Sequence, residues 1–137
     1  AVADVLAHYP VDPERVFLAG FSMGGYGVYR TALAQPGHFR GLVVLAGQPD
    51  LGPQWLGTGH PDALDPANLA RLKGEAFFIV HGTEDRNCPF AKTVQMVEGL
   101  RAAGAQVTFL AEPGRGHDGP SAEGEAQCLA WLAARAK

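Results

Sequence analysis

The sequence predicts an α/β fold, in which a parallel sheet carries helices on both faces. Four short, mostly apolar runs are typical of strands, and they span 16–19, 42–46, 76–80 and 106–110. The first three are typical of strands buried on both sides. Helical stretches separate these runs, and such alternation implies parallel strands joined by right-handed crossovers. With 137 residues, of which 47% are apolar and 18% charged, a single globular domain is expected.

The expected helices cover 1–9, 23–34, 65–73, 90–103 and 122–136. Pro10 ends the first helix, and Gly104 is a typical stop for the fourth. Asp65 followed by Pro66 is the pattern of a capping residue and a first helical residue. The last helix is expected to bury Ala126, Leu129 and Leu132, whereas 47–64 shows no regular pattern.

Charge and hydropathy exclude several classes of protein. The formal net charge is -3 and lysine and arginine do not cluster, so a nucleic-acid partner is disfavoured. No apolar run approaches the roughly 20 residues that a membrane-spanning helix needs. No spacing typical of metal ligands occurs, and neither a metal nor an organic cofactor is implied. The sequence carries no signal for an oligomeric state or a cellular location.

The two cysteines, Cys88 and Cys128, lack the CxxC spacing of metal and redox motifs. The favoured interpretation is two small buried apolar side chains, and a single disulfide between them is the alternative.

The sequence starts at Ala1, within an expected helix and without a preceding signal segment. We therefore expect that the natural N-terminus is missing.

The segment Gly20-Phe21-Ser22-Met23-Gly24 matches the G-x-S-x-G nucleophile elbow between a strand and a helix. This turn lifts the serine hydroxyl above the sheet, and side chains two residues before and after it are expected to collide. The following helix directs free N–H groups toward a developing oxyanion. The competing interpretation is an ordinary glycine-rich turn.

Asp85 follows the third expected strand, where ligand-facing residues emerge in open α/β sheets. A carboxylate here can orient an imidazole, although a plain turn aspartate is the competing interpretation. Glu84 is a weaker alternative. His81 is expected to be structural and to point away from the Asp85 loop.

His117 lies in the Gly- and Pro-rich loop after the fourth strand, where it can reach both Ser22 and Asp85. Alone, it would be interpreted as a solvated surface histidine, which suits His8, His38 and His60. The order Ser, Asp, His along the chain is that of the α/β-hydrolase triad, and each residue falls at a strand's carboxyl end. The combination favours a catalytic site.

The sequence resembles the α/β-hydrolase superfamily, and more closely its dienelactone hydrolase, carboxylesterase and prolyl-oligopeptidase-like branches. The stretches that carry the resemblance are VDPERVFLAGFSMGGYGVYRTAL, GLVVLAG, AFFIVHGTEDRNCPF and GRGHDGP. The resemblance implies strands five to eight of an eight-stranded α/β-hydrolase fold. It places Ser22, Asp85 and His117 on the triad and the Met23 backbone N–H on one oxyanion donor.

The second oxyanion donor of that family comes from a loop that this chain lacks. Removing one such donor typically lowers the rate by about 10²–10³-fold. The chain alone is therefore expected to be poorly active, and poorly stable because one sheet edge would be bare.

The expected chemistry is hydrolysis of carboxylic esters or peptide amides through an acyl-enzyme, with activity rising as His117 loses its proton. A small-molecule ester or short peptide would be the substrate. Trp55 is expected either to form a pocket wall or lid or to cover the core. The alternatives are a non-catalytic binding module of the same fold, an inactive fragment, or a different acyl-transfer reaction.

Overall fold

The computed structural model describes residues 2–137, and Ala1, the first residue of the expected N-terminal helix, lies outside them. The described residues form one parallel sheet with the strand order β1-β2-β3-β4. The strands are β1 (Phe17–Phe21), β2 (Gly41–Leu45), β3 (Ala76–Gly82) and β4 (Gln106–Glu112). The α-helices are α1 (Val2–His8), α2 (Met23–Ala34), α3 (Pro66–Arg71), α4 (Phe90–Ala102) and α5 (Ala122–Arg135). The expected α/β class is confirmed.

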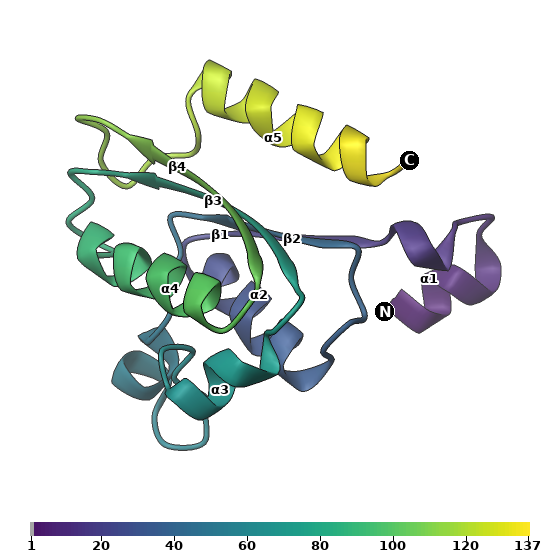
Figure 1. Ribbon diagram of the computed structural model, residues 1–137, viewed down its shortest axis with the longest axis horizontal. Coiled ribbons are helices and arrows are strands. Elements are labelled where there is room, and N and C mark those ends of the chain that lie inside the picture. Colours follow the sequence, from purple (N-terminus) through teal and green to yellow (C-terminus); the bar gives the residue numbers. More distant parts are fainter. Residues whose placement is uncertain (1) are drawn as a thin grey trace.

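Helices lie on both faces of the sheet, with α2 and α4 on one face and α5 on the other (Figure 1). Side chains alternate along each strand, so Phe77 and Ile79 of β3 pack against α2 and α4. Phe78 and Val80 point the opposite way and pack against α5. The two apolar layers hold the carboxyl ends of the strands in fixed positions.

Burial differs between the central and the edge strands. All seven residues of β3 are buried, as expected for a strand with a neighbour on each side. In β1 no residue is fully buried, and Phe21 is 42% exposed. The expectation that the first strand is buried on both faces is therefore wrong, because β1 pairs with one neighbour in the described sheet.

Of the three residues expected to face the sheet from helix α5, Leu132 does so, and the expectation was wrong for the other two. Cys128, Trp131 and Leu132 pack on the sheet, whereas Ala126 and Leu129 are exposed. The helix is turned by about one position, and the large indole of Trp131 contacts Phe78, with ring centroids 5.7 Å apart. Alanine and leucine occur on several faces of this helix, so their spacing alone did not define the buried side.

The segment between β2 and α3 contains a π-helical turn, η2 (Gly52–Leu56), where no regular pattern was expected. Tyr26 of α2 is buried and donates a hydrogen bond to the Pro61 carbonyl at 2.8 Å, which anchors the segment. Trp55 is 77% exposed, so it does not cover the core. The α3 helix begins as expected, with the Asp65 carboxylate accepting from the Ala67 N–H.

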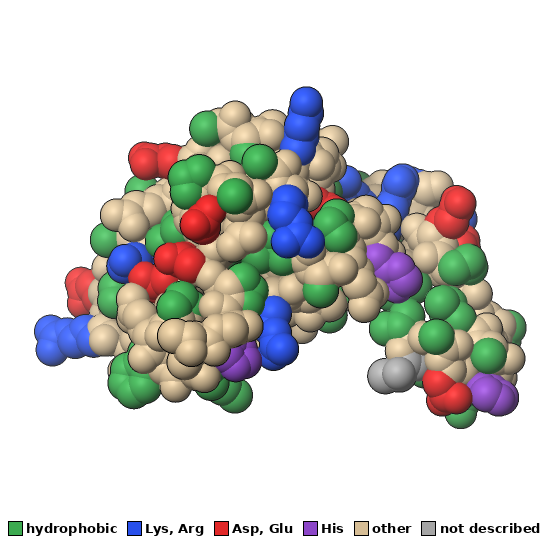
Figure 2. All heavy atoms as spheres, turned by 90° about the horizontal axis from the view of Figure 1, so that it is seen from below, with side chains coloured by type: hydrophobic (Ala, Val, Ile, Leu, Met, Phe, Trp, Pro, Cys, Tyr) green, Lys and Arg blue, Asp and Glu red, His purple; other side chains and the backbone are tan. Residues whose placement is uncertain are grey.

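Helix α1 stands apart from the sheet and has no buried residue (Figures 1 and 2). A short 3₁₀ turn, η1 (Pro13–Arg15), joins it to β1. On the face drawn in Figure 2, basic and acidic side chains are interspersed rather than gathered by sign. Within residues 2–137, no helix is both long and apolar enough to cross a membrane.

Candidate active site

Ser22 occupies a sharp turn between β1 and α2. Its backbone has φ +55° and ψ -118°, a conformation that residues with a side chain rarely adopt. The Ser22 N–H donates to the Leu45 carbonyl of β2 at 2.9 Å, which ties the turn to the sheet. This strand, strained turn and helix make up the geometry expected of a nucleophile elbow.

Glycine is required on one side of the turn but not on the other. A Cβ atom at Gly20 would lie 2.1 Å from the Gly24 carbonyl oxygen, so no larger residue fits there. A Cβ atom at Gly24 would have no heavy atom within 4 Å, and the expected collision at that position is wrong. The second close approach is at Gly25, where a Cβ atom would lie 2.7 Å from the Gly47 Cα.

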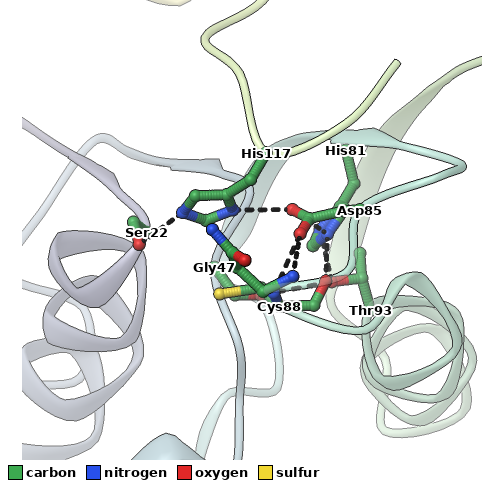
Figure 3. A network of polar contacts seen from close by, with 8 residues as sticks. Ser22, Gly47, His81, Asp85, Cys88, Thr93 and His117 are labelled. Atoms are coloured by element: carbon green, nitrogen blue, oxygen red, sulfur yellow. Dashed lines mark hydrogen bonds and ion pairs between the residues drawn. The ribbon is translucent and has the colours of Figure 1, made fainter.

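The structure brings Ser22, His117 and Asp85 together in one hydrogen-bonded chain (Figure 3). The His117 Nε2 atom lies 2.8 Å from the Ser22 Oγ atom. The His117 Nδ1 atom lies 2.8 Å from Asp85 Oδ2. With Nδ1 donating its proton to the carboxylate, Nε2 is left with a lone pair that faces the serine hydroxyl.

Hydrogen bonds between two loops fix the distance from Asp85 to His117. The Thr83 N–H donates to the Glu112 carbonyl at 3.0 Å, and the Glu84 N–H donates to the Arg115 carbonyl at 2.9 Å. In the other direction, the Gly114 N–H donates to the Thr83 hydroxyl at 2.9 Å. The loops after β3 and β4 thus continue the pairing of their strands beyond the sheet.

Asp85 is buried, with its carboxylate surrounded by N–H donors. Oδ1 accepts from the backbone N–H groups of Asn87 at 2.8 Å and Cys88 at 2.9 Å. Burial raises the pKa of Asp85, but the hydrogen bonds from His117, Cys88 and Asn87 outweigh burial and lower it from its ordinary value. Glu84 is exposed and takes no such position, which favours Asp85 over this neighbour.

His81 does not point away from the Asp85 loop, and this expectation was wrong. Its side chain is fully buried, and its Nε2 atom lies 3.1 Å from Asp85 Oδ2. The same nitrogen lies 2.8 Å from the Cys88 carbonyl oxygen, and Nδ1 lies 2.8 Å from the Thr93 hydroxyl of α4. Burial lowers the pKa of His81, although the Cys88 carbonyl and Asp85 act in the opposite direction.

The two cysteines are free thiols, so the alternative of a disulfide is excluded. Cys88 is buried, as the favoured interpretation expected, and it lies between Asp85 and Ser22 (Figure 3). Burial raises the pKa of the Cys88 thiol, and the charge of Asp85 raises it further, while Ser22 lowers it. At neutral pH the thiol is therefore protonated and a poor nucleophile. Cys128 is only partly buried, on the sheet side of α5.

The Met23 N–H lies at the first position of α2, where no carbonyl of the helix can accept it. It therefore remains available beside Ser22 as a donor for an oxyanion. The side chains of Met23 and Phe21 are 63% and 42% exposed, and the Phe21 ring lies 5.1 Å from the His117 ring. Exposed apolar residues thus precede and follow Ser22 in the chain, and the ring of one of them lies close to His117.

The remaining histidines and the cavities lie elsewhere. His8 belongs to α1, and His38 and His60 take no part in the hydrogen-bonded chain of Figure 3. A cavity of about 810 Å³ opens at the amino-terminal ends of β3 and β4, lined among others by Ala76 and Gln106, far from Ser22. Among residues 2–137, no group of three His, Cys, Asp or Glu side chains is placed to hold a metal ion.

Sequence reasoning missed His81, Thr93 and Gly25. A usable signal existed for His81, because it precedes Asp85 by four residues at the end of an apolar strand. The role of Thr93 depends on how α4 packs, and that of Gly25 on its contact with Gly47, so neither was visible in a local pattern.

The parallel sheet, with Ser22 beyond β1, Asp85 beyond β3 and His117 beyond β4, is that of the α/β-hydrolases, and comparisons with solved structures agree on this class. The Arabidopsis thaliana SOBER1 crystal structure superposes with a TM-score of 0.75 at 25% identity, over 99% of this chain and 60% of that one. Within this class, a model of the prolyl oligopeptidase family (Peptidase_S9) matches residues 52–137. The chain belongs to the prolyl oligopeptidase family.

Curated relatives are similar in parts of the sequence. A poly(3-hydroxyoctanoate) depolymerase of Pseudomonas fluorescens is 28% identical over 123 residues, which is 90% of this chain and 41% of that protein. An S-formylglutathione hydrolase of Rattus norvegicus is 45% identical over 40 residues, which is 29% of this chain and 14% of that protein. The chain spans less than half the length of these curated relatives.

Proposed function

We propose that the chain carries the catalytic triad of a serine hydrolase, with Ser22 as nucleophile, His117 as general base and Asp85 as its orienting acid. The observation that carries the proposal is the pair of 2.8 Å contacts from His117 to Ser22 and to Asp85. The strained backbone of Ser22 adds support, because strain of this kind is characteristic of a nucleophile elbow.

In the first step, Ser22 Oγ attacks the substrate's carbonyl carbon while His117 Nε2 accepts the hydroxyl proton. The tetrahedral intermediate collapses, and the imidazolium returns that proton to the departing alcohol or amine. The product of this step is an acyl-enzyme on Ser22. A water molecule then attacks the acyl carbon with His117 again as base, which releases the acid and restores the serine hydroxyl.

The developing oxyanion needs N–H donors, and the Met23 N–H supplies one of them. The positive end of the α2 dipole acts in the same direction, because the helix begins immediately after Ser22. Asp85 stabilises the His117 imidazolium without taking its proton, since its own pKa is lowered.

The substrate class that we propose is an uncharged carboxylic ester, with a peptide amide as the alternative. Phe21 and Met23, the residues before and after Ser22, are exposed apolar side chains, which suits an apolar acyl group. The depolymerase relative is named for a polyester and the S-formylglutathione hydrolase for a thioester, which also favours esters. The family name favours the amide.

We further propose that residues 1–137 are the C-terminal part of a single α/β-hydrolase domain. The free edge of β1 supports this proposal, because an exposed parallel edge strand with unpaired backbone groups ordinarily pairs with another strand. The share of the relatives that the chain spans, 41% and 60% in the two longest matches above, agrees with it. A second oxyanion donor would then come from the remainder of the domain.

The test is a panel of p-nitrophenyl esters and short peptide p-nitroanilides, applied to the complete gene product. We expect hydrolysis of short-chain esters that Ser22→Ala lowers by about 10⁴-fold or more. Ser121→Ala is the matched control, because Ser22 and Ser121 are the two serines of this sequence. A folded parent that hydrolyses neither type of substrate would favour a non-catalytic binding module.

A further inference from the structure

We infer that His81 is a positioning residue, whose neutral imidazole donates a hydrogen bond to Asp85 and holds that carboxylate in place for His117. The inference rests on the proposed function, since it assigns a task within the same site. Two imidazoles then share one oxygen, because Asp85 Oδ2 lies 2.8 Å from His117 Nδ1 and 3.1 Å from His81 Nε2.

The partners of His81 determine which of its nitrogens carries the proton. The Cys88 carbonyl oxygen, 2.8 Å from Nε2, can only accept, so Nε2 must carry a hydrogen. That N–H also faces Asp85 Oδ2 and is shared between the two oxygens. In a neutral ring Nδ1 is then unprotonated, so the Thr93 hydroxyl donates to it at 2.8 Å in preference to the Gly47 carbonyl oxygen, which lies 3.2 Å from that hydroxyl.

The neutral state follows from the surroundings of the ring. The His81 side chain is fully buried, and burial is the largest influence that lowers its pKa. The titratable groups that act on it are Asp85, which favours the charged ring, and His117, which disfavours it. The residues of α4 that contact the His81 ring are Thr93 and Phe90, and neither side chain titrates.

His81 contributes something that the other donors to Asp85 do not. The N–H groups of Asn87 and Cys88 hold Oδ1, but they belong to the same turn as Asp85 and move with it. His81 belongs to the buried strand β3, and Thr93 belongs to α4. The imidazole therefore links Oδ2 to β3 and α4, whose residues lie on one side of Asp85 in Figure 3.

The same contact moderates the charge that His117 faces. A hydrogen bond from His81 draws part of the negative charge on Oδ2 away from His117. Without it, the carboxylate would hold the proton on His117 more tightly. The acidic limb of the kcat/KM profile would then move to higher pH, a result that simple loss of folding would not produce.

The experiment compares His81→Leu and His81→Gln with the parent in the complete gene product, with ester hydrolysis measured as a function of pH. In His81→Leu we expect kcat to fall about tenfold, KM to stay within about twofold, and the acidic limb to rise by about 0.5 pH unit. His81→Gln keeps an N–H near the position of Nε2. It should therefore restore most of the parent's kcat and most of the position of the acidic limb.

Val80→Ala is the matched control, because Val80 is the preceding buried residue of β3 and its side chain packs on the opposite face, toward α5. It should lower the melting temperature without moving the acidic limb. The inference would be overturned if the acidic limb of the kcat/KM profile of His81→Leu stays in place or moves to lower pH. An equal displacement in Val80→Ala, or a His81→Gln variant that behaves like His81→Leu, would also overturn it.

A measurement that needs no substrate separates this inference from the proposed function. Nitrogen-15 NMR of the His81 ring should show the neutral Nε2–H tautomer at about pH 7, since the pKa of this ring is lowered. That tautomer in a protein without hydrolytic activity would overturn the proposed function and leave the contact with Asp85 intact. An Nδ1–H tautomer, or a protonated ring, in an active enzyme would overturn the role of His81 alone.

Discussion

At the scale of single residues, the site depends on proton positions that neighbouring groups fix. Asp85 is buried, yet N–H donors on both carboxylate oxygens keep it ionised. His117 has its Nδ1 proton held by that carboxylate, which leaves Nε2 free to accept from Ser22. A change that alters the acceptor at Asp85 should therefore disable His117 while the fold persists.

Asp85→Asn tests this dependence. The asparagine amide can present its NH₂ group toward His117, which forces the proton of that imidazole onto Nε2, where it cannot accept from Ser22. We expect kcat to fall by about 10⁴-fold with little change in the thermal unfolding midpoint. Ester hydrolysis at the plateau pH and a melting curve measure the two effects. A variant that keeps its rate within about tenfold of the parent would contradict the assigned role.

The buried groups also predict how stability depends on pH. The pKa of His81 is lowered mainly by burial, so on acidification the unfolded chain takes up its proton before the folded protein does. Stability should therefore decline as pH falls below about 6.5, the ordinary histidine value. The pKa of Asp85 is also lowered in the folded protein. The stability that Asp85 contributes is therefore fully present above its ordinary pKa of 3.8, and it is lost as the pH falls through the pKa of Asp85 in the folded protein.

Urea denaturation at a series of pH values, for the parent and His81→Gln, measures the first of these effects. Glutamine does not titrate, so the variant should lose less stability than the parent between about pH 7 and pH 4.5. Parallel declines in the two proteins would show that His81 does not cause the effect.

At the scale of elements, the turn from β1 to α2 depends on two close backbone approaches. Gly20 faces the Gly24 carbonyl and Gly25 faces the Gly47 Cα, whereas a side chain at Gly24 would project into open space. The G-x-S-x-G pattern treats its two glycines as equivalent, and the structure separates them. The difference can be measured with one added methyl group at each position.

Gly20→Ala should destabilise the fold by at least about 2 kcal/mol, because the added carbon cannot be accommodated without moving the turn. Gly24→Ala should change the free energy of unfolding by less than about 1 kcal/mol, with alanine the better helix former. Chemical denaturation of both variants measures the difference. Equal losses at the two positions would contradict the packing described for this turn.

Local patterns predicted the elements well because proline, glycine and capping residues stop helices by steric rules that act locally. The α2 helix has the expected bounds, and Asp65 caps α3 as expected. The contacts of His81 and the buried side of α5 depend on how distant elements pack. The prediction for His81 was wrong, and that for α5 was right only at Leu132. Ser22, Asp85 and His117 could be named together as candidates because parallel strands deliver their carboxyl ends to one edge, and the structure places the three in one hydrogen-bonded chain.

At the scale of the whole molecule, the sheet is well packed in the centre and open along one side. Every residue of β3 is buried between two helical layers, whereas β1 has hydrogen-bonded neighbours on one side and half-exposed side chains. The apolar composition of 16–19 does not show how far β1 is buried, because the composition of a strand does not specify which elements lie beside it. We propose that another part of the same domain pairs with the free edge of β1.

Hydrogen exchange of the isolated chain and of the complete gene product tests that proposal. In the isolated chain, the amides of β3 should be the most protected, and those of β1 that face away from β2 should exchange much faster. In the complete protein the β1 amides should become slow, while β3 changes little. Rapid exchange of β1 in both samples would show that no further strand pairs with it.

The central claim is that His117 activates Ser22, and covalent labelling tests it most directly. We would treat the complete gene product, Ser22→Ala and Ser121→Ala with a fluorophosphonate probe and locate the adduct by peptide mass spectrometry. The account predicts a single adduct on Ser22 in the parent and in Ser121→Ala, and none in Ser22→Ala. A folded parent that stays unlabelled, or an adduct that persists in Ser22→Ala, would contradict it.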